Sequence, residues 1–161
     1  MRKTVLYTLM SLDGDVDQPA RYFTTSLEPG RHMFDEWSQY WPTSDVQPFA
    51  DFINSVKKYV VTSTPLSNHW HNTEAVTGPI EDVVRDLKAR PGDDIGIHDS
   101  IQLAQSLLAA GLVDELQLVV GPAIGFMGRR LFASTRHVRR LELLSATPTP
   151  SGSLLLAYRV P

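Results

Sequence analysis

The sequence predicts an α/β fold with a mixed, mostly parallel sheet flanked by helices and a C-terminal antiparallel hairpin. Short runs of β-branched and other apolar residues alternate with amphipathic helical patterns, which is typical of βαβ units. Strands separated by helices of about 10–12 residues are expected to lie parallel, because parallel strands need a long crossover connection. The last two apolar runs are separated only by residues 148–152, which are rich in Pro and Gly, so they are expected to form the hairpin.

Seven segments are expected to be strands. The first is a buried run that ends at the turn-forming pair Asp13-Gly14. The expected strands cover residues 4–10, 59–63, 74–77, 95–98, 116–120, 141–147 and 153–160. Residues 15–30 show no clear periodicity and are expected to form a loop.

Four segments have helical spacing of their bulky apolar residues. They cover residues 31–41, 49–58, 79–90 and 100–110. The clearest is 79–90, which has Pro79 at its first position, two acidic residues in its first turn, basic residues in its last turn, and Pro91 after it. The last helix is expected to be capped by Gly111.

Length and composition indicate one globular domain over residues 1–161. The chain has 161 residues, 42% of them apolar and 20% charged, which is too apolar for a disordered protein. It has no cysteine, which excludes disulfides, thiol catalysis and thiolate metal sites. Its apolar stretches are far shorter than the ~20 residues of a membrane span, and the N-terminal apolar run breaks too early for an export signal. We therefore expect a cytoplasmic protein that does not bind membranes.

The charge argues against a nucleic-acid partner. The net charge is −3 and the isoelectric point is near 5.9, whereas phosphate binding calls for a basic face. One local exception is the segment 129–140, which holds five arginines and His137 but no acidic residue. A solvated basic face is the favoured interpretation, and attraction of a phosphorylated substrate is the alternative.

The turns that follow strands are the places to look for chemistry, because ligands of such sheets bind beyond the carboxyl ends of the strands. The first of these turns is Ser11-Leu12-Asp13-Gly14. A carboxylate at Asp13 could hold a polar substrate group or assist proton transfer. Alternatively, Asp13-Gly14 only makes a turn.

The second turn is His98-Asp99-Ser100, which runs directly from a strand into a helix. The N-terminus of a helix carries unpaired N–H groups and a partial positive charge, so it can bind phosphate. Asp99 would repel a pyrophosphate, however, and either Asp99 or Ser100 could serve as an ordinary N-cap.

The third turn contains Gly125, Phe126 and Gly128 and leads to Arg129 and Arg130. A glycine loop beside arginines suits an anionic ligand. The same residues also fit a plain turn with a solvated basic face.

An aromatic stripe of Phe34, Trp37 and Trp41 lies on the first expected helix. Such a stripe is most simply part of the core, although it could equally line a pocket for a flat heterocycle. His69 and His71 are too few for a metal site, so no metal is expected, and no spacing suggests a hydrolytic triad.

Taken together and in this order, the three turns resemble those of one family. Further similar motifs are Gly30-Arg31, Tyr40-Trp41-Pro42, the run from Gly111 to Leu116, and Gly128-Arg129 before Leu131-Phe132. The chain resembles dihydrofolate-reductase-like proteins related to the C-terminal reductase domain of the bifunctional riboflavin-biosynthesis deaminase-reductase. The resemblance covers essentially the whole chain.

This resemblance implies a dihydrofolate-reductase-like sheet, a homodimer, and an NADPH-dependent reductase that passes a hydride to a pyrimidine of the riboflavin-precursor type or to a pterin-like heterocycle. It also implies roles for individual residues. Asp13 would lie near the substrate, with Phe34, Trp37 and Trp41 as pocket walls. Cofactor contacts would come from Gly30 and Arg31 (phosphates), Thr62, Ser63 and Thr64 (adenosine), His98, Asp99 and Ser100 (pyrophosphate), and Gly125, Phe126 and Gly128 (nicotinamide).

The chain departs from the family pattern at the cofactor positions. The family usually has glycine followed by serine or glycine at His98-Asp99, a leucine-glycine pair at Gly125-Phe126, and often a basic residue at Thr64. The sequence does not distinguish NADPH from NADH, so NADH is one open alternative. The other is a catalytically degenerate dimer that keeps the scaffold as a ligand-binding or regulatory protein without a cofactor.

Overall fold

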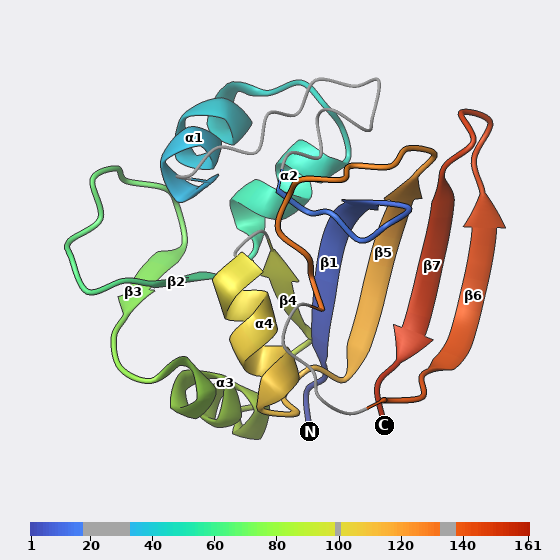
Figure 1. Cartoon of the computed structure of the whole chain (residues 1–161). Helices are drawn as coiled ribbons and strands as arrows, with labels where there is room; N and C mark the ends of the chain where they lie inside the picture. Colours follow the sequence, from blue (N-terminus) through green and yellow to red (C-terminus); the bar gives the residue numbers. More distant parts are fainter. Residues whose placement is uncertain (18–32, 99–100, 133–137) are drawn as a thin grey trace. The chain divides into compact units, whose positions relative to one another are not determined.

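Five strands form one mixed sheet in the computed structural model, which describes residues 1–17, 33–98, 101–132 and 138–161 (Figure 1). In spatial order the strands are β4 (Ile95–His98), β1 (Thr4–Ser11), β5 (Glu115–Gly121), β7 (Leu154–Arg159) and β6 (Glu142–Pro148). β1 is parallel to β4 and β5, whereas β7 is antiparallel to β5 and β6. The predicted fold class, with its C-terminal antiparallel hairpin, is confirmed.

The chain divides into two compact units. Unit 1 comprises Met1–Pro29 and Val84–Pro161, and unit 2 comprises Gly30–Val83. The five-stranded sheet belongs entirely to unit 1. The expectation of a single domain over residues 1–161 stays a prediction.

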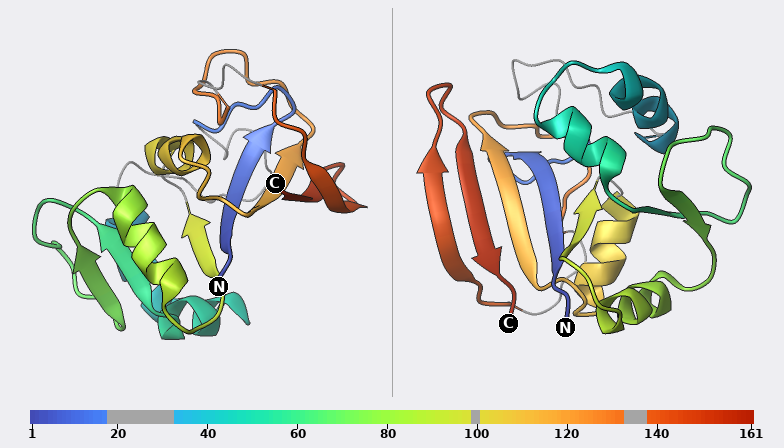
Figure 2. Two further views of the ribbon diagram at one scale, coloured as in Figure 1. Left: turned by 90° about the horizontal axis from the view of Figure 1, so that it is seen from below. Right: turned by 180° about the vertical axis from the view of Figure 1, so that it is seen from behind.

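A large part of the core of unit 1 lies on one face of its sheet. Leu6 in β1 is opposite Ile97 in β4 and Leu116 in β5, and all three side chains are buried. Helix α4 (Ile101–Ala109) lies against the sheet and contributes Leu107, which is completely buried (Figure 2). The opposite face is more polar, because Gln117 and Glu115 point there from β5, at positions that alternate with the buried ones.

A partly exposed carboxylate fixes the start of β1. The Asp114 carboxylate accepts hydrogen bonds from the backbone N–H and the hydroxyl of Thr4, both at 2.7 Å, and from the ammonium group of Lys88 at the end of α3 (Ile80–Ala89). Burial alone would raise the pKa of Asp114, but the hydrogen bonds from Lys88 and Thr4 outweigh it, so the pKa lies below its ordinary value. The ionised Asp114 therefore ties β1 to the last turn of α3.

Unit 2 has its own aromatic core and a small parallel sheet. Its elements are α1 (Met33–Tyr40), the 3-10 helix η2 (Trp41–Thr43), α2 (Phe49–Ser55), β2 (Lys58–Val61) and β3 (Thr73–Val76). The buried residues of this core are Trp41, Ala50, Ile53 and Trp70. Strands β2 and β3 pair with each other in parallel and form a two-stranded sheet in the described part of the chain.

The separate β2–β3 sheet differs from the simplest expectation, in which all parallel strands share one sheet. Central strands of parallel sheets are covered on both faces and are nearly continuously apolar. β3 reads Thr-Glu-Ala-Val and keeps Glu74 and Ala75 exposed, so it lacks the apolar surface that such a position requires. Among the described helices, none is both long and apolar enough to cross a membrane.

Candidate active site

Two loops lie side by side where β1 and β5 end. Because β1 and β5 are parallel neighbours, their carboxyl ends meet at the same edge of the sheet, which is where ligands of α/β sheets bind. The loop after β1 is connected to the loop after β5 by backbone hydrogen bonds from Leu12 N to Ala123 O (2.8 Å), from Val16 N to Arg129 O (2.9 Å), and from Leu131 N to Gly14 O (3.3 Å). The expected turn is present: Gly14 has φ +83° and donates to Ser11 O at 3.0 Å.

Asp13 anchors the loop that follows β5. Its carboxylate accepts hydrogen bonds from the amides of Gly125 (2.8 Å) and Phe126 (3.1 Å) and from the Ser11 hydroxyl, and it lies 3.1 Å from the Arg130 guanidinium. The Ser11 hydrogen bond, followed by those from the amides, holds the pKa of Asp13 well below its usual range. The Asp13 carboxylate is therefore ionised at neutral pH, so it can position groups but cannot donate a proton.

The two amides that bind Asp13 form a small anion-binding site of the backbone. Successive N–H groups point to one acceptor when a residue with positive φ follows a turn, and Phe126 has φ +64°. Here the acceptor is the protein's own carboxylate. A phosphate group would have to displace Asp13 to use these amides, so the turn containing Gly125, Phe126 and Gly128 is poorly suited to phosphate while this contact exists.

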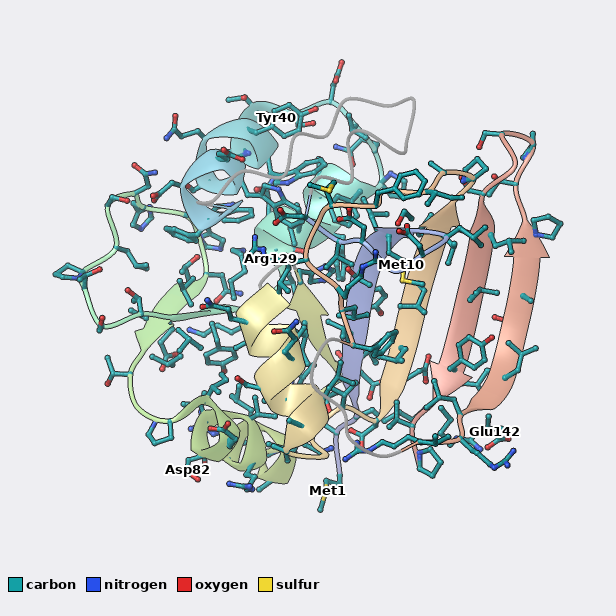
Figure 3. All side chains as sticks on the ribbon, in the orientation of Figure 1. Met1, Met10, Tyr40, Asp82, Arg129 and Glu142 are labelled. Atoms are coloured by element: carbon teal, nitrogen blue, oxygen red, sulfur yellow. The ribbon has the colours of Figure 1, made fainter. Side chains whose placement is uncertain are left out.

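Asp15 is a site residue that the sequence analysis did not single out. It is 1% exposed, and its carboxylate accepts hydrogen bonds from the amides of Gly128 and Asp17, both at 2.9 Å. Asp17 in turn pairs with Arg129, which lies on the loop after β5 (Figure 3). The sequence feature that could have pointed to Asp15 is the alternation of Asp13, Asp15 and Asp17 in a segment without apolar periodicity.

The tip of the loop after β5 presents apolar side chains to solvent. Phe126 is 75% exposed and Met127 is 91% exposed, and the neighbouring Ile124 and Leu12 are also exposed. Large apolar groups held outward by a hydrogen-bonded loop favour contact with an apolar ligand surface. The loop tip therefore offers an exposed apolar surface.

His98 is a partly buried ring on the polar face of the sheet. It stacks on Tyr7 of the neighbouring strand, with ring centroids 4.9 Å apart, and Gly96 leaves room for it. Burial lowers the pKa of His98, so the imidazole is neutral at neutral pH. Asp99 and Ser100, like Gly30 and Arg31, lie outside the described residues.

The aromatic stripe of unit 2 belongs to its core. Trp41 is 4% exposed and packs among Trp37 and Phe49, and Phe34 and Trp37 pack against the same cluster while remaining partly exposed. Trp41 was also expected to be a wall of the substrate pocket, and this role stays a prediction. The pocket role of Phe34 and Trp37 stays a prediction.

A pocket of about 470 Å³ lies at the carboxyl ends of β2 and β3 in unit 2. It is lined by Thr62 and Ser63, which were predicted, and by Val61, Thr77 and Gly78, which were not. Thr62 N donates to Val76 O at 3.1 Å, which joins the two strand ends. Thr64 does not line the pocket, but it is hydrogen-bonded to the Thr62 hydroxyl at 3.1 Å. The sequence pattern did not predict that the ends of β2 and β3 lie side by side, so Thr77 and Gly78 were not predicted as site residues.

Three of the arginines in the segment 129–140 have partners within the protein. Arg129 and Arg130 pair with aspartates, and Arg139 donates to Leu108 O at the end of α4 at 3.0 Å. Arg136 and His137 lie outside the described residues. No group of three or more His, Asp or Glu side chains in the described segments is arranged to hold a metal ion, and His69 and His71 are exposed.

The fold and these loops define a class of α/β proteins in which two hydrogen-bonded loops lie at the carboxyl edge of a mixed sheet. The family model for the RibD C-terminal domain matches residues 36–155. The chain belongs to this family. No curated protein matches it.

Solved structures with the same fold come from several bacteria. A protein from Shewanella sp. PV-4 assigned to riboflavin biosynthesis has a TM-score of 0.70 and 15% identity, with 99% of each chain covered. A pyrimidine reductase-like protein from Corynebacterium diphtheriae has a TM-score of 0.58 and 16% identity, covering 99% of this chain and 92% of that one. A diaminohydroxyphosphoribosylaminopyrimidine deaminase/5-amino-6-(5-phosphoribosylamino)uracil reductase from Thermotoga maritima has a TM-score of 0.64 and 12% identity. The match covers 99% of this chain and 57% of that one.

Proposed function

We propose that this protein is a nicotinamide-dependent reductase that passes a hydride to a pyrimidine of the riboflavin-precursor type or to a related pterin-like heterocycle. The observation that carries the proposal is the match to the RibD C-terminal domain family over residues 36–155. Structures of the same fold include proteins described as a pyrimidine reductase-like protein and as a diaminohydroxyphosphoribosylaminopyrimidine deaminase/5-amino-6-(5-phosphoribosylamino)uracil reductase. The loops after β1 and β5 are joined by hydrogen bonds, and together they offer a defined surface at the edge of the sheet where a ligand could bind.

Each unit, taken by itself, holds residues that suit one part of a nicotinamide dinucleotide. The pocket of unit 2 offers the hydroxyls of Thr62, Ser63 and Thr77, which suit the ribose of an adenosine. The loop tip of unit 1 offers the apolar Phe126 and Met127, which suit an uncharged nicotinamide ring. When bound, the cofactor supplies the hydride, and the protein supplies orientation and exclusion of water.

Asp13 acts in this proposal as a positioning residue. Its ionised carboxylate fixes the backbone of Gly125 and Phe126 and so determines where the loop tip lies. Because its pKa is depressed, the proton needed after hydride transfer comes from another group or from water.

One observation favours the alternative of a degenerate binding or regulatory protein. The amides of Gly125 and Phe126 are already occupied by Asp13, so they are not available to a ligand phosphate. A protein of this kind would keep the scaffold and bind a heterocycle without a cofactor.

A binding and turnover experiment separates the two. A ligand that binds only the native state raises the melting temperature. The reductase proposal predicts a rise in melting temperature with millimolar NADH or NADPH, and oxidation of that nucleotide when a pyrimidine substrate is added. If neither effect is seen, the reductase proposal is wrong and the degenerate binding or regulatory protein is the remaining proposal.

We also propose that the protein is a homodimer. All seven residues of the edge strand β6 are exposed, including Leu143 and Leu144, and β7 adds the exposed Leu154 and Leu155. Exposed leucines that gather on an edge strand and its neighbour form an apolar patch, and such patches often mark association surfaces. A second copy of the chain would cover these leucines.

A further inference from the structure

Phe126 has a backbone conformation that a bulky side chain rarely adopts. Its φ is +64°, in the left-handed region, where the Cβ atom of an L-residue crowds the following carbonyl oxygen. Glycine has no Cβ atom and adopts this conformation without that crowding. The phenylalanine therefore introduces strain at a position where glycine would not.

Packing of the side chain does not explain this strain. Phe126 is 75% exposed, so its ring buries only a small part of the apolar surface whose burial stabilises a folded protein. The other described non-glycine residue with positive φ is Asn72, at +58°. Asparagine tolerates this region, and the side-chain amide of Asn72 donates to Ser55 O at 2.9 Å. Asn72 thus serves the local structure, whereas the ring of Phe126 is mainly in contact with solvent.

Hydrogen bonds on both sides of Phe126 hold its backbone in place. The amides of Gly125 and Phe126 donate to the Asp13 carboxylate at 2.8 and 3.1 Å. On the other side, Met127 N donates to Gly125 O at 2.9 Å. A strained residue persists only where the surrounding structure holds it, and such residues cluster at ligand-binding sites. The strained and exposed ring of Phe126 therefore indicates a role in binding.

The surface around Phe126 is apolar and lies at the carboxyl edge of the sheet, where ligands of α/β sheets bind. Met127 is 91% exposed, Leu12 66% and Ile124 54%. Leu12 N donates to Ala123 O at 2.8 Å, which joins the loop after β1 to the loop after β5. A phenyl ring in such a surface favours stacked or edge contacts with another flat ring. The chemistry that fits this surface is a flat, uncharged heterocycle.

We propose that Phe126 sets the ligand specificity of the loop tip, because its ring stacks on a flat, uncharged heterocycle of the bound ligand. The strain at this position is retained for that contact. The inference rests on the proposed function, in which the heterocycle is the nicotinamide of the cofactor or the pyrimidine or pterin-like ring of the substrate. Phe126 thus selects ligands by the ring that they carry.

Melting temperatures of three variants test whether Phe126 is strained. Phe126→Gly removes both the ring and the crowding, Phe126→Ala removes only the ring, and Phe126→Tyr keeps both. We expect Phe126→Gly to melt about 2–4 °C above Phe126→Ala and no lower than the wild type. A Phe126→Gly variant that melts well below the wild type would show that the ring stabilises the fold, which would overturn the inference.

Binding to the same variants is measured by calorimetry, without turnover. The ligands are NADH, NADPH, 5′-AMP, which lacks the nicotinamide, and a 5-amino-6-ribosylaminouracil phosphate. If the nicotinamide contacts the ring, Phe126→Gly and Phe126→Ala should bind the two dinucleotides about three- to tenfold more weakly, with 5′-AMP unchanged. If the pyrimidine contacts the ring, only the uracil compound should lose affinity by that factor. Phe126→Tyr should retain the wild-type affinities in either case.

Asn72→Gly is the matched control, because it places glycine at the other described position with a non-glycine residue of positive φ. It should leave all affinities unchanged. Unchanged affinities in Phe126→Gly and Phe126→Ala, or an equal loss of affinity for 5′-AMP, would overturn the inference and leave the reductase proposal intact. If neither dinucleotide nor the uracil compound binds the wild-type protein at millimolar concentration, both proposals are wrong.

Discussion

Gly128 packs so closely on Asp15 that a Cβ atom on Gly128 would lie 1.9 Å from the Asp15 Oδ1 atom. The two residues belong to loops that follow neighbouring strands, and the Gly128 amide donates to Asp15 Oδ2 at 2.9 Å. Only glycine permits this approach, so the contact sets the spacing of the two loops at the carboxyl edge of the sheet. Asp15 and Gly128 thereby support the loop tip that we propose to hold the nicotinamide.

Replacing Gly128 with Ala should lower the free energy of unfolding by about 1–3 kcal/mol, because the added methyl group overlaps a buried carboxylate. Urea denaturation followed by circular dichroism measures this. The same substitution in an Asp15→Ala background should cost less, with a coupling energy of about 1 kcal/mol or more. Strictly additive effects would show that the two residues do not interact as described.

Asp13→Asn should change how stability depends on pH. The pKa of Asp13 is lower in the native state than the 3.8 of an unperturbed aspartate, so its ionised form stabilises the native state above that pH. This contribution is lost as the pH falls below about 4. Melting temperatures between pH 7 and 3 should therefore fall more steeply for the wild type than for Asp13→Asn. The exposed Asp45→Asn serves as the control, and wild-type and Asp13→Asn curves that run parallel would contradict the role of Asp13.

His98 should make the protein less stable at mildly acidic pH. Burial lowers its pKa in the native state, whereas the unfolded chain takes up a proton at the ordinary value of about 6.5. The free energy of unfolding should therefore fall as the pH drops below about 6.5. His98→Phe keeps a ring that can stack on Tyr7 but cannot titrate, so its stability should change less between pH 7 and 5. An unchanged pH dependence in the variant would contradict this account.

The homodimer proposal predicts that charge on the edge strand separates the subunits. Leu143→Arg introduces a cation on the exposed apolar surface of β6, which should disfavour burial against a second copy. Light scattering after size exclusion should give twice the 18.0 kDa mass for the wild type and the single mass for the variant. Ser151→Arg, in the exposed turn between β6 and β7, is the matched control. A monomeric wild type would contradict the proposal.

Much of the fold could be predicted from the sequence because local patterns determine it. The strand at residues 95–98 and the helices at 79–90 and 100–110 were found within about a residue of β4, α3 and α4, since their apolar spacing and end residues agree. The separation of β2 and β3 into their own sheet could not be predicted. The separation depends on which strands pair with each other. A strand of four residues has too short a pattern of apolar and polar residues to predict its partner.

The site was predictable in position but not in detail. The turn at Asp13 and the glycine loop lie at one edge of the sheet, as parallel neighbours require. The hydrogen bonds of Asp13 to Gly125 and Phe126 join residues more than a hundred positions apart, and no local pattern specifies such a pairing. The same limit hid Asp15, whose burial follows from its contact with Gly128, and the partners Thr77 and Gly78 of the unit 2 pocket.

Transfer of an isotopically labelled hydride tests the central claim most directly. The purified protein is incubated with NADH or NADPH deuterated at the transferable position of the nicotinamide and with a 5-amino-6-ribosylaminouracil phosphate, and the product is analysed by mass spectrometry. The reductase account predicts one deuterium per product molecule and one nucleotide oxidised for each. Oxidation of neither nucleotide, together with an unlabelled and unreduced pyrimidine, would contradict it.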